Sequence, residues 1–289
     1  MKFESYFEPS TVDECIQILA EQKSDVKLLA GGTDLVIRMR SRVLKPKAVV
    51  SLNAIPELSE VTVKEDGLYI GAMARLMDVS KSELLTGAWK IIKTGAGNVS
   101  SMQVRNIATI GGNTCNASPS ADTVPGLVVS GAMANIVGKN GSRSVLLEDF
   151  FTGPGKTVLA EDEMLVGFIV PKYADKTGAV YKKYSIRGDT DIAIIGVAGK
   201  VTLNEQGAVA DVKIALGGVA PTVMRVPAAE DLLKGKMLTD QLIEEAAVVA
   251  SEACKPITDA RATKEYRKEM VMVWVQHVLK DALQEAQNN

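Results

Sequence analysis

Two pairs of adjacent glycines constrain this chain most, because each pair follows a short hydrophobic run and precedes a polar residue. The first lies in segment 27–35 (KLLAGGTDL) and the second in segment 108–113 (ATIGGN). A strand that ends in paired glycines can turn sharply and present backbone N–H groups, with no Cβ in the way, to an anionic ligand. Each pair by itself also fits an ordinary strand-end turn. Two such turns in one domain are what a long nucleotide with a central pyrophosphate requires.

Length and charge narrow the class of protein. The 289 residues with 46% hydrophobic content predict a globular chain of about two domains. A net charge of −2 and a pI near 5.7 give no electrostatic case for a nucleic-acid partner. The basic clusters at 38–42 and 45–47 are too short to change this, and we interpret them as solvated surface.

The sequence shows neither a targeting signal nor a cysteine pattern typical of a disulfide or metal site. The first residues lack the apolar stretch of a signal peptide, and no run approaches the roughly 20 apolar residues of a membrane span, so we expect a cytoplasmic protein without membrane contact. Cys15, Cys115 and Cys254 are odd in number and far apart, which excludes a disulfide framework and a zinc or iron–sulfur ligand set. We interpret Cys115 as a small buried packing residue and His277, the only histidine, as structural.

The hydrophobic pattern predicts a β/α beginning, with a helix at 11–22 and strands at 26–30 and 48–52. Strands and turns then alternate with helices, and Asn140-Gly141 is a strong hairpin signal. The further elements predicted before residue 172 are a hairpin of strands 61–63 and 68–71, helices at 75–86, 87–97 and 123–130, and a hairpin of strands 134–138 and 144–147.

A polar segment at 172–178 is the predicted domain boundary. Beyond it, runs of strands precede runs of helices, which is typical of an α+β domain. The predicted elements are strands at about 180–186, 192–203 and 209–219 and helices at about 228–235, 239–253 and 259–286.

Two common nucleotide-binding motifs do not match this sequence. Segment 153–157 (GPGKT) is similar to the end of a phosphate-binding P-loop, but the first glycine of that motif would fall on Phe150. Segment 95–100 (GAGNVS) lacks the third glycine of the dinucleotide fingerprint and follows a helical pattern instead of a strand. We therefore exclude a Rossmann-type site.

The order of the glycine segments resembles the flavin-binding subunit of the xanthine dehydrogenase family of molybdenum hydroxylases, in which an AGGTDL loop and a TIGGN loop hold the FAD pyrophosphate. Segment 181–193 is similar to the family's Y-x-K-x-x-x-R-x-x-x-D-I-A stretch. Further matches lie at 103–106, 151–156 and 261–267, so the resemblance spans nearly the whole chain in collinear order.

The resemblance implies the fold. We expect an α+β protein with a vanillyl-alcohol-oxidase-type, PCMH-like FAD-binding domain over residues 1–174, made of two α/β subdomains at about 1–55 and 56–174. An α+β C-terminal domain over residues 175–289 would contain a three-stranded antiparallel sheet with helices.

The resemblance also implies site residues. The first loop would donate backbone and hydroxyl hydrogen bonds to the pyrophosphate, and the second would approach it from the other side. Asp122 would lie near the FAD sugar hydroxyls, with a helix N-cap as its alternative role, and Leu165 would pack by the flavin. The predicted cofactor-binding residues are Leu29, Ala30, Gly31, Gly32, Thr33, Asp34, Leu35, Thr109, Gly112, Asn113, Ser118, Asp122, Leu165 and Lys183.

Lys183 is the residue predicted to tune the cofactor. A fixed cation near the flavin N1 and C2 carbonyl favours the electron-rich reduced ring. The alternative is a surface lysine, just as Arg187 and Asp191 could form a structural ion pair. Because segment 188–190 differs from the more charged loop of animal members, we do not transfer their acceptor preference.

The function implied is that of an electron-transfer flavoprotein, an oxidoreductase subunit that carries FAD. A molybdenum–pterin and two [2Fe–2S] clusters would belong to a large and a small partner subunit, in a dimer of heterotrimers, with an acceptor such as NAD. The resemblance is strongest to bacterial xanthine dehydrogenase subunits, and the cysteine-rich insertion of benzoyl-CoA-type reductases is absent. Purine or another N-heterocycle is therefore the expected organic substrate.

Two alternatives of different classes remain open. A self-contained flavin oxidase of the vanillyl-alcohol oxidase kind would share the fold, but it needs acid–base residues over the flavin and often a His or Cys for covalent attachment. A single distant histidine and 4% aromatic residues argue against it. A non-redox nucleotide-binding module would bind ADP as tightly as FAD.

Overall fold

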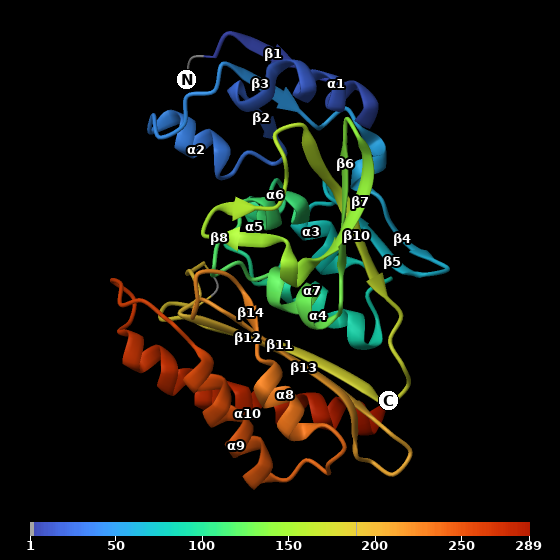
Figure 1. The fold of residues 1–289 in the computed structure, drawn as a ribbon, viewed down its shortest axis with the longest axis vertical. Coiled ribbons are helices and arrows are strands. Elements are labelled where there is room, and N and C mark those ends of the chain that lie inside the picture. Colours follow the sequence, from blue (N-terminus) through green and yellow to red (C-terminus); the bar gives the residue numbers. More distant parts are fainter. Residues whose placement is uncertain (1–2, 189) are drawn as a thin grey trace.

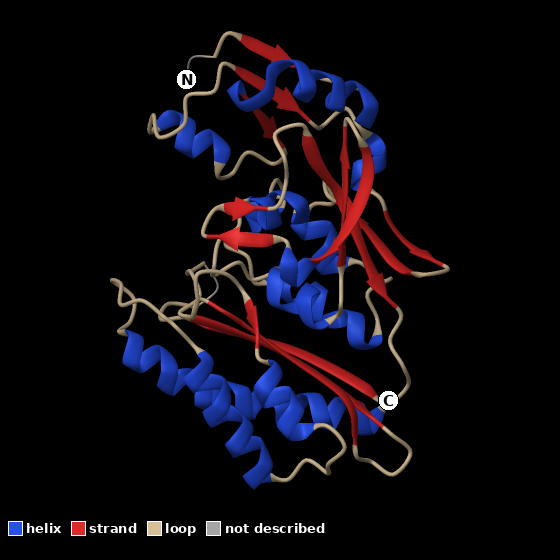
Figure 2. Cartoon of the chain, viewed as in Figure 1, coloured by secondary structure: helices blue, strands red, loops and turns tan. Residues whose placement is uncertain are grey.

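Three main sheets follow one another along the longest axis of the molecule in this computed structural model, which describes residues 3–188 and 190–289 (Figure 1). The N-terminal part lies at one end of this axis and the C-terminal helices at the other (Figure 2). The mixture of helices and sheets agrees with the expected α+β class. Within the described residues, no helix combines the length and the apolar composition that a membrane span needs.

The first sheet is parallel and small. Its helix α1 (Val12–Gln22) begins where the Thr11 hydroxyl accepts a hydrogen bond from the Glu14 N–H, and it buries Cys15 and Leu19 against the sheet. A second helix, α2 (Leu35–Arg40), follows the first glycine pair. The strands, in spatial order, are β1 (Ser5–Phe7), β3 (Ala48–Ser51) and β2 (Val26–Leu29).

The second sheet has five antiparallel strands, and its central strand is a continuous apolar run. Helices between this sheet and the third one form the largest core, together with Leu68, Ile70 and Phe168. The strands are, in spatial order, β4 (Val61–Lys64), β5 (Gly67–Gly71), β10 (Glu163–Pro171), β6 (Met133–Gly138) and β7 (Gly141–Leu146). The helices are α3 (Leu76–Lys81), α4 (Lys90–Gly97), α5 (Met102–Arg105), α6 (Ile110–Cys115) and α7 (Val124–Val129), and a small separate hairpin pairs β8 (Phe151–Gly153) with β9 (Lys156–Thr157).

The third sheet has four antiparallel strands, so the expectation of three was wrong. The added strand is only two residues long and pairs with Ala215 and Leu216, which leaves too short a pattern to be recognised in the sequence. The strands are β11 (Thr177–Tyr184), β12 (Ile195–Leu203), β13 (Val209–Gly217) and β14 (Met224–Arg225), and the helices are α8 (Pro227–Leu233), α9 (Asp240–Ala253) and α10 (Lys264–Asn288).

Both faces of the third sheet are buried. Tyr181 and Ala198 belong to the large core with α4 and α7, whereas Val197 and Ile214 pack against α9 and α10. Successive side chains of a strand point to opposite faces, so one sheet serves two cores. A Cβ on Gly178 would lie 2.0 Å from the Ala282 carbonyl oxygen, which shows how closely α10 approaches β11. The C-terminal sheet is thereby fixed against the part of the chain that carries the glycine motifs.

Candidate functional site

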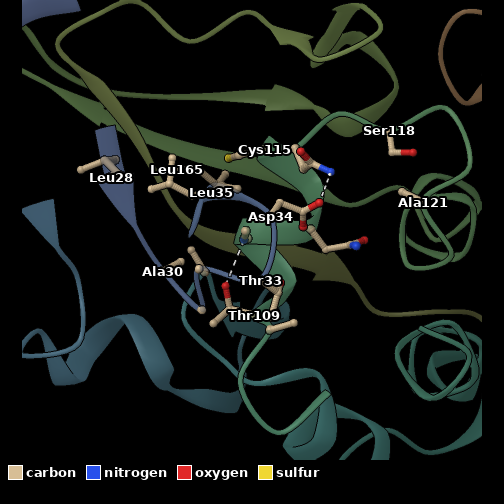
Figure 3. A pocket seen from close by; sticks show the side chains of 18 of the residues that line it. Leu28, Ala30, Thr33, Asp34, Leu35, Thr109, Cys115, Ser118, Ala121 and Leu165 are labelled. Atoms are coloured by element: carbon tan, nitrogen blue, oxygen red, sulfur yellow. Dashed lines mark hydrogen bonds between the residues drawn. The ribbon is translucent and has the colours of Figure 1, made fainter. Parts of the chain in front are cut away.

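A cavity of about 900 Å³ lies among the first glycine loop, α6 and the loops beside the third sheet (Figure 3). Its volume is in the range of cofactor pockets. The predicted site residues that line it are Ala30, Gly31, Gly32, Thr33, Asp34, Leu35, Thr109, Gly112, Asn113, Ser118, Asp122 and Leu165. Leu29 and Lys183 do not line it.

The first glycine loop presents a run of N–H groups to this cavity. Gly32 has φ +71, a backbone conformation that favours glycine, and it directs the chain from β2 into α2. Within the described residues, the N–H groups of residues 31–35 donate to no protein acceptor. Consecutive unpaired N–H groups of this kind form an anion-binding concavity. We call residues 31–35 the N–H loop.

Leu29 supports the N–H loop from outside the cavity. A Cβ on Gly32 would lie 2.8 Å from Leu29 Cδ1, so this leucine packs beneath the loop instead of facing a ligand. A Cβ on Gly31 would lie 2.2 Å from the Ile107 carbonyl oxygen, which shows that the loop rests directly on the segment before α6. Both positions therefore have a steric reason to be glycine.

The second glycine pair does not end a strand, as the sequence predicts, but lies in the first turn of α6. The Thr109 hydroxyl caps this helix by accepting a 3.0 Å bond from the Gly112 N–H, and the Gly111 N–H donates to the Ala72 carbonyl. Because these N–H groups are already bonded, this pair is not a second set of free donors. A Cβ on Gly111 would lie 2.6 Å from Ala72, so the glycine permits close packing.

Side chains of α6 supply polar groups where backbone groups are occupied. The Asn113 amide oxygen accepts a 2.7 Å bond from the Thr123 hydroxyl, which orients the side chain and leaves its NH₂ group as the donor for a ligand. Asn116 donates to Asp34 over 3.3 Å and so connects α6 to the N–H loop (Figure 3). The two glycine segments thus meet at one end of the cavity.

Asp122 is a cavity-lining carboxylate held by two buried partners. Its Oδ1 accepts a 2.8 Å bond from the Tyr181 hydroxyl, and its Oδ2 accepts a 2.9 Å bond from the Lys183 ammonium. Burial raises the pKa of Asp122, while the Lys183 charge and the hydrogen bonds from Lys183 and Tyr181 oppose that shift. The helix N-cap alternative was wrong, because the cap position of α7 is Thr123, which makes no side-chain cap bond.

Lys183 is buried, so the alternative of a surface lysine was also wrong. Only 7% of its side chain is exposed, and its ammonium also donates to the Asn98 carbonyl over 2.9 Å. The structure therefore brings Lys183 to the cavity through Asp122 and not as a lining residue. Its tuning of a flavin stays a prediction.

Several lining residues were missed in the sequence. Residues 190–192 lie beside the cavity, and the Arg187–Asp191 ion pair proposed as an alternative is present at 2.9 Å. Hydrogen bonding to Arg187 lowers the pKa of Asp191 to about 2. The sequence signal that could have identified residues 190–192 is the family-like stretch 181–193, which contains them. Met73 and residues 159–161 also line the cavity, but nothing in their local sequence distinguishes them.

Reactive side chains are few here. Cys115 is half-buried and lines the cavity, so the prediction of a buried packing residue was only partly right. Burial raises the pKa of its thiol to about 12, which keeps it protonated and a poor nucleophile. His277 is exposed on α10 against Trp274, with ring centroids 5.8 Å apart, and does not line the cavity. Within the described residues, no group of three or more His, Cys, Asp or Glu could hold a metal ion.

The donor set fits a dinucleotide. The N–H loop suits a pyrophosphate, Asp122 suits sugar hydroxyls, and Leu165 from β10 offers an apolar contact to a ring, all on one cavity. The glycine positions at which a Cβ would collide with the neighbouring backbone explain why this loop is built without side chains.

Comparison with known proteins agrees with a dinucleotide site of this kind. Residues 1–173 match the family model described as the FAD binding domain in molybdopterin dehydrogenase, and residues 179–282 match the CO dehydrogenase flavoprotein C-terminal domain. The chain is 31% identical over 283 residues to the xanthine dehydrogenase FAD-binding subunit of Escherichia coli O157:H7, which covers 97% of this chain and 96% of that protein. It is 33% identical over 278 residues to the carbon monoxide dehydrogenase medium chain of Hydrogenophaga pseudoflava, with 96% of each chain covered.

A solved structure gives the same relationship in three dimensions. Carbon monoxide dehydrogenase from Hydrogenophaga pseudoflava, in a form that lacks the Mo-pyranopterin moiety of its molybdenum cofactor, superposes with a TM-score of 0.94, 33% identity and 98% coverage of both chains. Sequence motifs, cavity and fold therefore agree, and the chain belongs to the family of FAD-binding flavoprotein subunits of molybdopterin-dependent dehydrogenases, which are oxidoreductases.

Proposed function

We propose that this chain is the FAD-carrying electron-transfer subunit of a multi-subunit molybdenum hydroxylase. The observation that carries the proposal is the run of unpaired N–H groups at residues 31–35, which opens on a cavity of about 900 Å³. Bound FAD would supply the redox chemistry of the isoalloxazine ring. The chain's own residues bind and orient it.

We assign ligand-binding roles to several of the predicted site residues. The N–H loop would donate to the pyrophosphate, with the Asn113 NH₂ group opposite it. Asp122, kept in place by Tyr181 and Lys183, would accept hydrogen bonds from sugar hydroxyls. Leu165 would pack against the flavin ring and help to exclude water from it.

The proposed partner subunits would supply the iron–sulfur clusters, for which this chain has too few cysteines. Its three cysteines are too few and too far apart for two [2Fe–2S] clusters, each of which takes four protein ligands. We therefore place the clusters in a small subunit and the molybdenum–pterin in a large subunit, with a dimer of heterotrimers in the cytoplasm and NAD as the acceptor. The relative from Hydrogenophaga pseudoflava is named a medium chain, which supports a subunit role.

The organic substrate of the complex is the finer part of the proposal. We propose xanthine or another N-heterocycle, because the segments at 151–156 and 261–267 resemble bacterial xanthine dehydrogenase subunits. The chain is nearly as similar to the xanthine dehydrogenase subunit, at 31%, as to the carbon monoxide dehydrogenase medium chain, at 33%. The test is to assay the co-purified complex on xanthine, hypoxanthine, nicotinate and CO, and turnover of CO alone would contradict this choice.

Cofactor binding is tested on the chain alone. Purified protein should show a flavin spectrum or take up added FAD, with one FAD per chain and much weaker binding of ADP. A colourless protein that takes up no FAD would overturn the proposal. Equal affinity for ADP and FAD would favour a nucleotide-binding module, and flavin reduction by a small alcohol without partner chains would favour a self-contained oxidase.

A further inference from the structure

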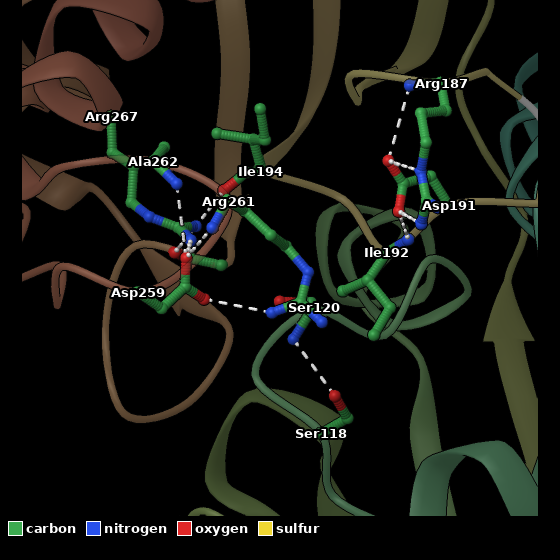
Figure 4. A network of polar contacts seen from close by, with 11 residues as sticks. Ser118, Ser120, Arg187, Asp191, Ile192, Ile194, Asp259, Arg261, Ala262 and Arg267 are labelled. Carbon is green, nitrogen blue, oxygen red and sulfur yellow. Dashed lines mark hydrogen bonds and ion pairs between the residues drawn. The ribbon is translucent and has the colours of Figure 1, made fainter.

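Arg267, at the start of α10, is buried although it does not line the cavity. Its guanidinium donates to the carbonyl oxygens of Ile194 and Gly218 and, over 2.8 Å, to Asp259 Oδ1 (Figure 4). Only 3% of its side chain is exposed. This residue belongs to segment 261–267, a family-like motif for which the cavity by itself gives no role.

Two of these partners connect to segments of the cavity wall. Residues 190–192 line the cavity, and Ile194 lies two positions after them in the chain. Gly218 donates its N–H to the Pro119 carbonyl over 2.7 Å. Pro119 lies within segment 118–122, whose other residues all line the cavity. We call 118–122 and 190–192 the two wall segments.

Gly218 lies between segment 118–122 and Ile194, the residue two positions beyond segment 190–192. This glycine has φ +77, and a Cβ on it would lie 2.8 Å from the Ile194 carbonyl oxygen and 3.3 Å from Ser120 Oγ. The Arg267 guanidinium bonds to the carbonyl oxygens of Ile194 and Gly218 at this junction. One rigid, planar group therefore fixes the spacing between Ile194, which follows one wall segment in the chain, and Gly218, which is hydrogen-bonded to the other.

Asp259 extends the contact to a second arginine. Its Oδ1 accepts from Arg267, and its Oδ2 accepts a 3.0 Å bond from Arg261. The Arg261 side chain then extends toward Ser118 and Ser120 (Figure 4). Burial raises the pKa of Asp259, but hydrogen bonds from the Arg261 N–H and from Arg267 outweigh it and lower the pKa to about 2. The carboxylate thus stays charged at neutral pH.

We propose that Arg267 is a positioning residue for FAD: it holds the two wall segments at the separation that the cofactor requires, with Asp259 as its anchor. The inference rests on the proposed function of the cavity. It gives the C-terminal domain a direct part in building the cofactor site.

The test compares buried Arg267 with half-buried Arg225. Arg267→Lys keeps the charge but cannot reach two carbonyls and a carboxylate together. The matched control is Arg225→Lys, since Arg225 of β14 forms ion pairs with Glu148 and with Glu230 of α8, and none of the three lines the cavity. Loss of charge-assisted hydrogen bonds should raise the FAD dissociation constant of Arg267→Lys by about tenfold. Arg225→Lys should lower stability but leave that constant within about twofold.

Hydrogen exchange of the apo protein supplies a readout that does not need FAD. In Arg267→Lys, the amides of Gly218, Ser120 and Ala121 should exchange faster than in wild type, whereas Arg225→Lys should leave them unchanged. Equal FAD affinities and equal exchange in the two variants would overturn the proposal. If wild type bound no FAD, the proposed function would fail, while altered exchange would still show that Arg267 couples the wall segments.

A third variant covers the case in which Arg267→Lys does not fold. Asp259→Asn removes the charge between Arg267 and Arg261 but keeps a hydrogen-bond acceptor. It should also weaken FAD binding and speed exchange at Gly218, to a smaller extent than Arg267→Lys. A folded Asp259→Asn protein with wild-type FAD affinity and wild-type exchange would contradict the role of Asp259 as the anchor.

Discussion

Gly31 and Gly32 are adjacent, but they obey different constraints. A Cβ on Gly31 would collide with backbone at Ile107, whereas a Cβ on Gly32 would meet mobile side-chain atoms of Leu29 and Val36 in a strained backbone conformation. We expect Gly31→Ala to abolish FAD binding, Gly32→Ala to weaken it, and Gly32→Val to prevent it, because a β-branched residue is stiff and disfavours positive φ. Gly153→Ala is the control, since no atom lies within 4 Å of its Cβ position. Flavin fluorescence titration measures the three affinities, and equal loss in Gly153→Ala would contradict the steric argument.

Lys183 should contribute to the stability of the fold even without a bound flavin. Lys183→Met leaves Asp122 as a buried carboxylate without its ion-pair partner, so we expect a loss of about 3 kcal/mol of unfolding free energy. The double variant Lys183→Met with Asp122→Asn should recover part of this loss in a urea unfolding experiment. Additive losses would show that the pair is not coupled. Loss of the Lys183 cation should also lower the flavin reduction potential by weakening the reduced form, which a dye-linked titration of FAD-loaded Lys183→Met measures separately.

The pH dependence of the Arg187–Asp191 ion pair follows from the pKa of Asp191. Its pKa is lowered from 3.8 to about 2 by hydrogen bonding to Arg187, so the pair's contribution is complete above about pH 4 and is lost as the pH falls toward 2. In NMR titrations, Arg187→Gln should move the Asp191 midpoint upward toward its usual value. An unchanged midpoint would mean that Arg187 does not hold this carboxylate in solution.

At the scale of elements, strand β10 connects the cavity to the sheet. Leu165 faces the cavity from this strand, and Glu163 at its start forms two 2.7 Å bonds with Arg143 of β7. Arg143 also donates to the Val158 carbonyl, which fixes the loop that contributes residues 159–161 to the cavity. The pair is partly exposed, so its effect on global stability is small.

Arg143→Leu should therefore change the rate of FAD release more than the stability of the fold. We expect faster FAD release in stopped-flow experiments, with the unfolding free energy changed by less than about 1 kcal/mol. Lys47→Leu is the control, because Lys47 forms an exposed pair with Asp25 and neither residue lines the cavity. Identical FAD release rates in the two variants would show that the loop needs no support from Arg143.

At the scale of the whole molecule, the cavity draws residues from the first sheet, from α6 and from the loop between β11 and β12. A ligand that bridges these parts stabilises all of them together. At 100 times its dissociation constant, FAD should add about 2.7 kcal/mol and raise Tm by about 5 °C in a single calorimetric transition. A second transition that FAD does not shift would show that the C-terminal domain is independent of the cofactor.

Local sequence signals predicted much of the local structure. The hairpin turning at 139–141, the helix beginning after Thr11 and the loop at 30–35 were all predicted, because turn residues, caps and glycine pairs act over a few residues. The central strand β10 was not predicted, since a continuous apolar run has no period that separates a buried strand from a buried helix.

The hydrogen-bond and ion-pair partners of the polar groups depend on the tertiary structure. The glycine N–H groups of α6 are already bonded to Thr109 and Ala72, Lys183 contacts the cavity-lining Asp122, and Arg267 binds the carbonyl oxygens of Ile194 and Gly218. These contacts join residues 61 and 49 positions apart, as for Asp122 with Lys183 and Gly218 with Arg267. No local pattern encodes them, because burial and partner choice depend on how distant segments pack together.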